Sequence, residues 1–584
     1  MSLRWLLSRL LIGLFPLALT TTVYLYLYPV FSGCAYPLPQ NNSSETSSAF
    51  LHTLQQHITP QSQPQLDKSA IVRLLVLADP QLEGDTSLPR PEYQLENRLR
   101  KHRDDVLASI DTAPFPLHLD VWAALQKAAR SVVRSDLPRA FKAARKRLDL
   151  LGNDYYLAHI YRTLHWWARP THVTVLGDLI GSQWLSDGEF AWRGERYWKR
   201  VFKGGERVED SYTMTGQGGY AAEAEGEQIF ELPSSPDWAH RIINIVGNHD
   251  VGYSGDASEK RIQRFEEVFG RANWDIRFRH PAVHVSVQGA GQGEGAAEIE
   301  ITPTLHLINL NSLTLDGPPF SQDIQGHGYA YINDLISHRS YPVDDRSTFT
   351  LLLTHLPLHK ADGVCVDGPY FSFFDADDDN EEQRYKAGGL REQNHLSEHV
   401  STHGVLQGIF GMSGDEGAPR GGLGRNGLIL TGHDHEGCDV VHSLHKSLPS
   451  VNADDDSDAP NEENDQEKEQ LCTWNATRYI PQTQESSSQS TPSIREITLR
   501  SMMGEYGGNA GLLSLWFDTT SAEWKHAMTL CPAGVQHIWW AVHVIDLVTL
   551  IVAVLYIISL IMSLARPGTG TQTGKVVAGD KKTR

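Results

Sequence analysis

The sequence predicts an α/β domain that lies between two membrane-spanning segments. Three observations predict this class: short hydrophobic runs that each end in Asp, Asn, Gln or His, helical stretches between them, and one long apolar run near each terminus. The 584 residues are enough to bury a large core. The formal net charge of −20 argues against a nucleic-acid partner, because binding a phosphate backbone requires clustered Lys and Arg.

The terminal apolar runs are long enough to cross a bilayer. Residues 10–31 and 547–565 carry no charge, and a helix of about 20 residues spans a hydrocarbon core of ~30 Å. Arg4 and Arg9 precede the first run, and a basic tail follows the second. The positive-inside rule therefore predicts cytoplasmic termini and a middle portion on the opposite side. A cleaved signal peptide is the alternative for the first run, although its apolar core would normally be shorter.

The last four residues, KKTR, place lysines at the third and fourth positions from the end. On a cytoplasmic tail they resemble a dilysine signal, which coat machinery reads to return proteins from the Golgi to the endoplasmic reticulum. Juxtamembrane tails are often basic for other reasons. With this signal, the protein would reside in the endoplasmic reticulum membrane, cycling to the Golgi, with a lumenal folded domain. The sequons at Asn41, Asn42 and Asn475 would then face a glycosylating, oxidising compartment.

These features divide the chain into consecutive parts. They are a cytoplasmic N-terminus (1–9), a transmembrane helix (10–31), a polar lumenal linker (32–69), the folded domain (70–530), a transmembrane helix with an interfacial lead-in (536–565) and a cytoplasmic tail (566–584). Two acidic stretches, near 371–385 and 447–492, lack periodic apolar residues, and we expect them to be disordered insertions. Apolar residues near the 3.6 period predict helices over 121–151 and 154–168, the second packed on a sheet.

Five hydrophobic runs within the domain end in potential metal ligands. Each run is short and rich in β-branched residues and leucine, as is typical of strands buried on both faces. In open α/β sheets, ligands bind at the carboxyl ends of such strands. The runs IVRLLVLAD, THVTVLGD, RIINIVGNHD, TFTLLLTH and NGLILTGHDH lead to Asp79, Gln81, Asp178, Asn248, His249, Asp250, His355, His433 and His435.

Each residue also has an ordinary explanation when it is considered alone. Asp79 before a proline could begin a turn, Gly177-Asp178 is a common turn dipeptide, and a single histidine such as His355 is more often a core residue. The order D-x-Q, GD, GNHD, H, GHDH, with every motif closing a hydrophobic strand, is much harder to explain by chance. We therefore predict one metal-binding site.

The motifs together resemble those of the calcineurin-like metallophosphoesterase superfamily, whose pattern runs D-x-H, GD-x-x-D, GNH-[D/E], H and GH-x-H. The resemblance covers roughly residues 70–515. It implies two packed mixed β-sheets flanked by helices and a site for two divalent metal ions. ADPQL, LGDLIGSQW, GNHDVGY, HLPLHK, GHDHEGC and SMMGEYGGNAGLL resemble a narrower group, the membrane-bound fungal enzymes that remove ethanolamine-phosphate from a mannose of GPI-anchor glycans.

The resemblance implies a role for each site residue. One metal ion would be bound by Asp79, Gln81, Asp178 and His435, and the other by Asp178, Asn248, His355 and His433. Asp178 would thus bridge the pair, as two-metal chemistry requires. His249 would donate a proton or hydrogen bond to the departing sugar oxygen, and Asp250 would orient it.

Two positions depart from the wider pattern. Gln81 replaces a histidine, and because an amide offers oxygen but no imidazole nitrogen, it favours manganese or magnesium over zinc or iron. We expect Mn²⁺. Gly181 stands where a carboxylate is usual, and Ser182 or Gln183 could substitute for it. The segment RGERYWKRVF (193–202) could receive substrate phosphates or form a solvated face.

The five cysteines show no CxxC spacing, which argues against a zinc ribbon. A disulfide between Cys365 and Cys438 is plausible because both lie on loops leaving the metal centre, with Cys472 as the rival partner of Cys438. We expect Cys34 to be unpaired.

The resemblance predicts a lumenal phosphodiesterase that trims the GPI-anchor glycan and supports export of GPI-anchored proteins, with GPI-cargo export receptors as partners. A catalytically weak trafficking adaptor with the same fold is one alternative. A phosphatase that affects manganese homeostasis is another. Which mannose is trimmed is not indicated by the sequence.

Overall fold

The computed structural model describes residues 3–37, 49–58, 72–84, 88–112, 118–213, 229–287, 297–337, 342–376, 384–447, 471–480, 491–504 and 507–564. The chain forms two units, which are described separately. One unit contains the two terminal helices, and the other, Pro29–Val535, contains all the strands.

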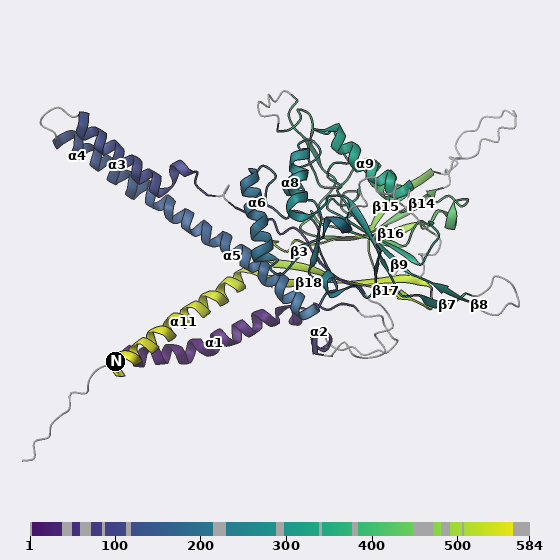
Figure 1. Ribbon diagram of the computed structural model, residues 1–584, viewed down its shortest axis with the longest axis horizontal. Helices are drawn as coiled ribbons and strands as arrows, with labels where there is room; N and C mark the ends of the chain where they lie inside the picture. Colours follow the sequence, from purple (N-terminus) through teal and green to yellow (C-terminus); the bar gives the residue numbers. More distant parts are fainter. Residues whose placement is uncertain are drawn as a thin grey trace, which may run out of the picture. The chain divides into compact units, whose positions relative to one another are not determined.

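Two mixed β-sheets form the centre of the larger unit, which confirms the predicted fold class (Figure 1). The first sheet has the strand order β18-β17-β1-β2-β5-β3, and the second has the order β15-β14-β16-β13-β10-β9-β6-β4. Two small hairpins, β7-β8 and β11-β12, complete the β-structure of the described residues. The bounds are β1 Val72–Leu77, β2 His172–Val175, β3 Glu206–Arg207, β4 Ile229–Glu231, β5 Arg241–Asn244, β6 Trp274–Arg279, β7 Val283–Val287, β8 Ala297–Ile301, β9 Thr304–Leu310, β10 Thr348–Thr354, β11 Phe371–Phe373, β12 Leu390–Gln393, β13 Gly427–Thr431, β14 Cys438–Ser447, β15 Leu471–Arg478, β16 Ser493–Thr498, β17 Gly507–Asp518 and β18 Glu523–Val535.

The hydrophobic core lies between the sheets and follows the two-residue period of the strands. Leu74 and Val76 of β1 belong to the same buried cluster as Leu351 and Leu353 of β10. Burying each such side chain contributes about 1.5–3 kcal/mol, so the sheet-to-sheet contact dominates the stability of this unit. Leu75, on the opposite face of β1, is equally buried.

The strands that end in predicted ligands are parallel neighbours. In the first sheet, β1 pairs with β2 and β2 pairs with β5; in the second, β10 pairs with β13. Parallel strands present their carboxyl ends at the same edge of a sheet. Three ligand-bearing loops from one sheet therefore lie together, as do two from the other.

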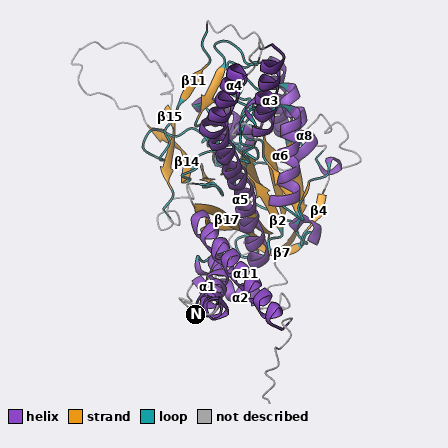
Figure 2. Cartoon of the chain, turned by 90° about the vertical axis from the view of Figure 1, so that its left-hand side faces the viewer, coloured by secondary structure: helices purple, strands orange, loops and turns teal. Residues whose placement is uncertain are grey.

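Helices flank the sheets, and Figure 2 shows α5, α6 and α8 on one side of the strands. Among the helices of this unit are α2 Ala49–Ile58, α3 Leu95–Thr112, α4 His118–Ser131, α5 Leu137–Ala168, α6 Asp187–Arg196, α7 Asn248–Val251, α8 Glu259–Phe269 and α9 Gln322–Ser337. As expected for 154–168, α5 packs on the sheet, because the Tyr156 hydroxyl accepts a hydrogen bond from the Gly508 backbone N–H of β17 (3.0 Å).

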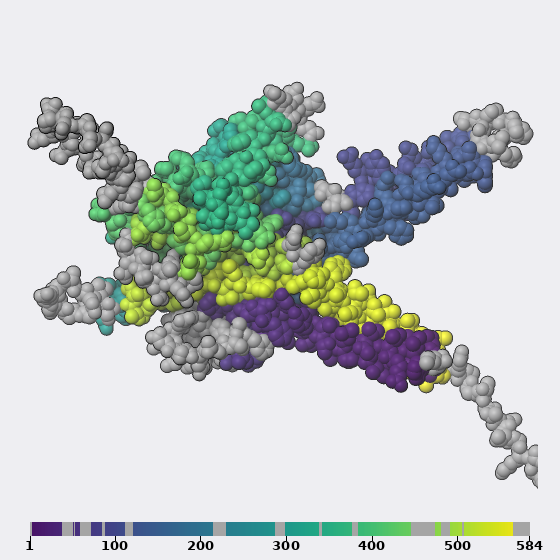
Figure 3. Space-filling model, turned by 180° about the vertical axis from the view of Figure 1, so that it is seen from behind, coloured from purple at the N-terminus to yellow at the C-terminus, as the bar shows by residue number. Residues whose placement is uncertain are grey.

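The predicted helix boundaries are wrong in one respect. The chain does not break between 151 and 154, and α5 runs without interruption through Gly152. Asp154 explains the continuity, because its buried carboxylate pairs with Arg196 (2.7 Å) and Arg200 (2.6 Å) and so anchors the middle of the helix. The first half of α5, with α3 and α4, forms an arm that extends away from the sheets (Figure 3).

Both acidic stretches that we expected to be disordered contain regular elements, and so does the polar linker. The linker 32–69 includes α2, whose His57 ring lies 4.2 Å from that of Trp166 on α5. The acidic stretches include β11, which pairs with β12, and β15, which pairs along β14. Residues 38–48, 59–69, 377–383, 448–470 and 481–490 of these stretches lie outside the described residues, and so do the sequons at 41 and 42 and the KKTR tail.

Two disulfides lie within the described residues. The Cys365–Cys438 bridge confirms the predicted pairing and excludes Cys472 as the partner of Cys438. The expectation that Cys34 is unpaired is wrong, since it bonds to Cys531 on β18. A sequence separation of 497 residues hid this pairing, and the fold brings the two Cα atoms to 5.5 Å.

The smaller unit contains two apolar helices, α1 Leu3–Phe31 and α11 Gln536–Leu564. Each has 29 residues, and a helix of that length extends about 44 Å, enough to cross a membrane. The Thr22 hydroxyl of α1 donates hydrogen bonds to both carboxylate oxygens of Asp546 on α11 (3.1 and 3.0 Å). This polar contact links the two helices at a point surrounded by apolar side chains.

Candidate metal centre

The structure brings the seven predicted ligand residues to one place, at the carboxyl ends of five strands. Ligand atoms of Asp178, His355 and His433 lie within 4.8 Å of one another, and so do those of Asp79, Asp178 and His435. Asp178 belongs to both groups. The geometry therefore offers two candidate cation sites that share one carboxylate.

The imidazoles of buried His355 and partly buried His433 are oriented by backbone carbonyls. His355 Nδ1 lies 2.8 Å from the Leu176 carbonyl oxygen, and His433 Nε2 lies 3.0 Å from that of Gln393. A carbonyl can only accept, so these nitrogens carry the protons and the opposite nitrogens present lone pairs. Burial favours the neutral rings, lowering the pKa of His355 and bringing that of His433 to about 3.

Two amide side chains complete the donor set. Asn248 Oδ1 lies 2.9 Å from His355 Nε2 and 3.0 Å from His433 Nδ1, the two nitrogens with free lone pairs. The Gln81 amide nitrogen lies 3.1 Å from Asp178 Oδ2 and 3.2 Å from His435 Nε2. The Asn248 amide thus lies beside the group that contains His355 and His433, and the Gln81 amide lies beside the group that contains His435.

The donor set fits divalent cations. Asp79 and Asp178 are 0% and 1% exposed, and Asp79 Oδ2 has no hydrogen-bond partner among the described residues. Burial and the nearby charge of Asp178 raise the pKa of Asp79 well above its usual value. A buried carboxylate pair is costly without positive charge beside it, and metal ions would supply that charge.

Backbone strain is concentrated at the same residues. Asp79, Gln81, Asp178 and His433 have φ angles of 52°, 43°, 51° and 72°. Only three other described non-glycine residues have positive φ, and such left-handed conformations cost about 1–3 kcal/mol each. Gly247 is required beside them, because a Cβ there would lie 1.9 Å from the Asp178 backbone nitrogen.

His249 lies beside the metal ligands, whereas the Asp250 carboxylate contacts other groups than the expected His249 ring. The His249 side chain is 39% exposed, and its Nε2 lies 3.8 Å from Asp178 Oδ2, at the edge of the ligand cluster. The Asp250 carboxylate is directed at the backbone rather than at His249: it accepts hydrogen bonds from the N–H groups of Leu179, Ile180 and Gly247 (3.2, 2.8 and 2.9 Å). It therefore joins the two loops that carry Asp178 and Asn248.

The segment 193–202 supports the loop after β1. Arg193 donates to the Leu82 carbonyl (2.9 Å) and Arg196 donates to the Glu83 carbonyl (2.7 Å), and both arginines are buried. The sequence left open whether this segment receives substrate phosphates or forms a solvated face. Neither interpretation suits these two arginines, because they hold the backbone next to Gln81. A side chain at position 181 would crowd the same loop, since its Cβ would lie 3.2 Å from the Gln81 carbonyl oxygen.

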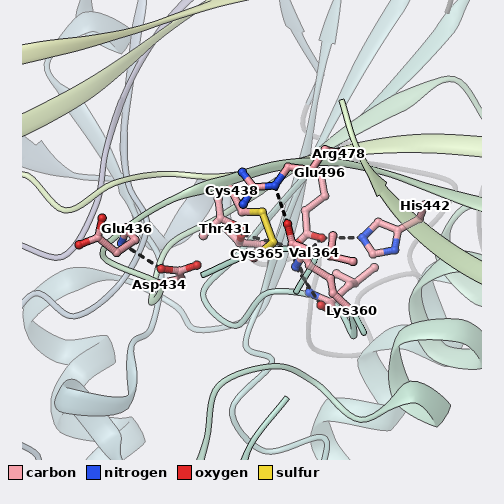
Figure 4. Close-up of a disulfide and its surroundings, with 12 residues drawn as sticks. Lys360, Val364, Cys365, Thr431, Asp434, Glu436, Cys438, His442, Arg478 and Glu496 are labelled. Atoms are coloured by element: carbon pink, nitrogen blue, oxygen red, sulfur yellow. Dashed lines mark hydrogen bonds and ion pairs between the residues drawn. A yellow bond between two sulfur atoms is a disulfide. The ribbon is translucent and has the colours of Figure 1, made fainter. Parts of the chain in front are cut away.

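Lys360, His442 and Glu496 form a second buried cluster, which we call the Glu496 cluster (Figure 4). Glu496 is 0% exposed and accepts hydrogen bonds from Lys360 Nζ (3.2 Å), His442 Nε2 (2.6 Å) and the Leu358 N–H (3.0 Å). The Cys365–Cys438 disulfide lies beside it. Together they join the loop after His355 to the strands that follow His435.

A pocket of about 360 Å³ opens onto the ligands and includes residues that the sequence did not indicate. Its lining beyond the predicted site residues consists of Gln183, Trp184, Tyr253, Phe374, Arg391, Glu392 and Asn394. Several of these come from the β11-β12 hairpin, inside and just beyond a stretch whose acidic composition suggested disorder. In the sequence, the only indication of these pocket residues was the aromatic and basic side chains at the two ends of the acidic stretch.

Comparison with known proteins identifies relatives of two kinds. The chain is 34% identical over 435 residues to Protein TED1 of Saccharomyces cerevisiae, covering 69% of this chain and 77% of that protein. An uncharacterized protein of Schizosaccharomyces pombe is 27% identical over 402 residues, covering 68% and 78%. Metallophosphoesterase 1 of Cricetulus griseus is 22% identical over 303 residues, covering 50% and 57%. No protein-family model matches the chain.

Proposed function

The chain belongs to the metallophosphoesterase family, and on that premise we propose that it is a phosphodiesterase that removes ethanolamine-phosphate from a mannose of the GPI-anchor glycan. The observation that carries the proposal is the carboxylate of Asp178, shared by two ligand groups at an open pocket. Such a site suits hydrolysis of a phosphate ester without a covalent intermediate.

The residues that would hold the metal ions are those described above, with Asp178 between the two positions. When bound, two divalent ions would supply the positive charge that activates a water nucleophile and stabilises the phosphoryl oxygens. Of the candidate metals we propose Mn²⁺, because Gln81 offers an amide where a histidine would favour zinc.

His249 is suited to assist the leaving group. Its backbone N–H donates to Asp178 Oδ1 (2.8 Å), which fixes the start of α7, while its half-exposed ring lines the pocket. A ring in this position can donate a proton or hydrogen bond to the departing sugar oxygen. Asp250 contributes by holding the loops on which His249 and Asp178 lie.

The proposed location is the endoplasmic reticulum membrane, with the catalytic unit in the lumen. Two disulfides suit an oxidising compartment, and the Asn475 sequon lies exposed on β15. Two apolar helices would hold the enzyme in the bilayer that carries its lipid-anchored substrate, which raises the effective concentration. Coat proteins that read the dilysine-like tail and GPI-cargo export receptors are the proposed partners.

Mass spectrometry of GPI glycans tests the proposal. Cells that lack the chain should accumulate glycans with one additional ethanolamine-phosphate, and wild-type chain should remove it whereas Asp178→Asn should not. Full restoration by Asp178→Asn would instead support the trafficking adaptor. Unchanged glycans in the deficient cells would contradict the proposed substrate.

A further inference from the structure

The pocket that opens onto the metal ligands is also lined by two adjacent side chains of opposite charge. Arg391 and Glu392 are neighbours on β12, and neighbours on a regular strand point to opposite faces. Both are exposed and both line the pocket. This arrangement requires a local departure from strand geometry.

A β-bulge provides that departure. Ser372 pairs with Glu392, but the next residue, Phe373, pairs with Leu390, so Arg391 is an extra residue without a partner on β11. Bulges turn side chains away from the alternating pattern and occur frequently beside active sites. The bulge therefore explains how Arg391 and Glu392 reach the same cavity.

The bulged strand is fixed to the metal centre. His433 Nε2–H donates to the Gln393 carbonyl (3.0 Å), and the Gly255 N–H donates to the Leu390 carbonyl (2.9 Å). The Gln393 amide also donates to Asp316 Oδ2 (3.3 Å). Arg391 and Glu392 are thus held between two anchored residues at a defined position relative to His433.

The two charges are available to a ligand. Among the described residues, Arg391 has no hydrogen-bond or ion-pair partner, and Glu392 has only a long contact with the Ser372 hydroxyl (3.4 Å). Nor do Arg391 and Glu392 pair with each other within the part of the chain that the structure describes. In contrast, most of the buried charges around the site are paired, as the Glu496 cluster illustrates.

The aromatic rings of Trp184 and Phe374 also line this pocket. Phe374 stacks on Tyr385 with centroids 4.2 Å apart, and Trp184 lies edge-on to Tyr385 at 6.4 Å. The Arg261 guanidinium carbon lies over the Trp184 ring, 4.4 Å from its centroid. Aromatic faces beside a carboxylate attract ammonium groups, whereas an unpaired arginine attracts phosphate.

We propose that Arg391 binds a non-bridging phosphate oxygen of the substrate, and that Glu392, together with Trp184 and Phe374, binds a primary ammonium group on the same substrate. The pocket would then select a phosphodiester that carries an amine over a neutral one. This inference rests on the proposed phosphodiesterase function and assigns its substrate selectivity to two residues of the β12 bulge.

The test uses the detergent-solubilised full-length chain with Mn²⁺ and two synthetic esters, 2-aminoethyl 4-nitrophenyl phosphate and ethyl 4-nitrophenyl phosphate. Wild type should prefer the amine ester by about tenfold or more in kcat/KM, since a charged contact is being gained. Glu392→Gln should reduce this preference to less than about twofold, and Arg391→Gln should lower kcat/KM for both esters by about tenfold. Glu300→Gln, an exposed glutamate on β8, is the matched control and should keep the preference.

A binding measurement separates this inference from the proposed function. Calorimetry should show that wild type binds 2-aminoethylphosphonate more tightly than ethylphosphonate and that Glu392→Gln removes the difference. If neither ester is hydrolysed, the phosphodiesterase proposal fails, while a calorimetric preference that depends on Glu392 still supports the ammonium site. Equal affinities in wild type, or a preference that survives in Glu392→Gln, would overturn the inference.

Discussion

Replacing Lys360 with methionine should destabilise the larger unit by about 3–5 kcal/mol, because it removes one partner of a buried ion pair. Lys360 is 1% exposed, and its ammonium group contacts both carboxylate oxygens of Glu496 (3.2 and 3.0 Å) and the Leu358 carbonyl (2.9 Å). In the variant, the Glu496 charge would remain in the core with His442, the Leu358 N–H and the Thr431 hydroxyl (3.4 Å) beside it, but without its cationic lysine partner.

The pH dependence of the unfolding free energy gives an independent measure of how much the Glu496 cluster stabilises the fold. Burial alone would raise the pKa of Glu496, but Lys360 and His442 lower it from 4.5 to about 2. A carboxylate with a lowered folded-state pKa stabilises the fold at pH values above its unfolded pKa. This contribution, roughly 3 kcal/mol, is lost as the pH falls from about 4.5 to about 2.

Urea unfolding of the solubilised chain, followed by tryptophan fluorescence, measures both effects. Lys360→Met should lower the unfolding free energy, and Lys360→Met combined with Glu496→Leu should recover at least about 1 kcal/mol, because the unpaired charge is then absent. The exposed Lys199→Met provides the control. A loss below about 1 kcal/mol for Lys360→Met, or no recovery in the double variant, would refute the reasoning.

Three further predictions concern the metal centre. Asp178→Asn should lose bound metal, measured by elemental analysis, and at least about 100-fold in kcat/KM; retained stoichiometric metal would contradict its bridging role. Gln81→His should shift the preferred metal from manganese toward zinc in a metal-dependent activity series, and an unchanged order would argue against Gln81 as a ligand. Gly247→Ala should lower the unfolding free energy by about 1–3 kcal/mol and weaken metal binding, since its Cβ would overlap the Asp178 backbone; near-wild-type urea unfolding would exclude the overlap.

The sequence predicted those parts of the fold in which local pattern and tertiary environment agree. The runs ending at Asp79 and Asp178 are rich in leucine and valine, and the strands β1 and β2 that they form are almost entirely buried, as is typical of strands covered on both faces. The ligand residues follow these runs directly, which makes their convergence predictable once the strands are parallel neighbours.

The remaining features depend on partners that are distant in the sequence. The periodicity predicted separate helices over 121–151 and 154–168, but Arg196 and Arg200 stabilise the continuous α5 by pairing with Asp154. Asp250 follows His249 in the sequence, yet its carboxylate is directed at the backbone of another loop. Arg391 gains its position from a bulge, which leaves no periodic pattern in the sequence.

The Cys34–Cys531 bond has a mechanical consequence. Cys34 follows α1 by three residues, and Cys531 precedes α11 by five. The disulfide therefore links the ends of the two helices covalently, although the two cysteines are 497 residues apart in the sequence. Tension applied between the two apolar helices, for instance by a deforming bilayer, would pass through the sulfur atoms rather than through the sheets. The strained loops that hold the metal ligands would thereby be shielded from membrane forces until the bond is reduced.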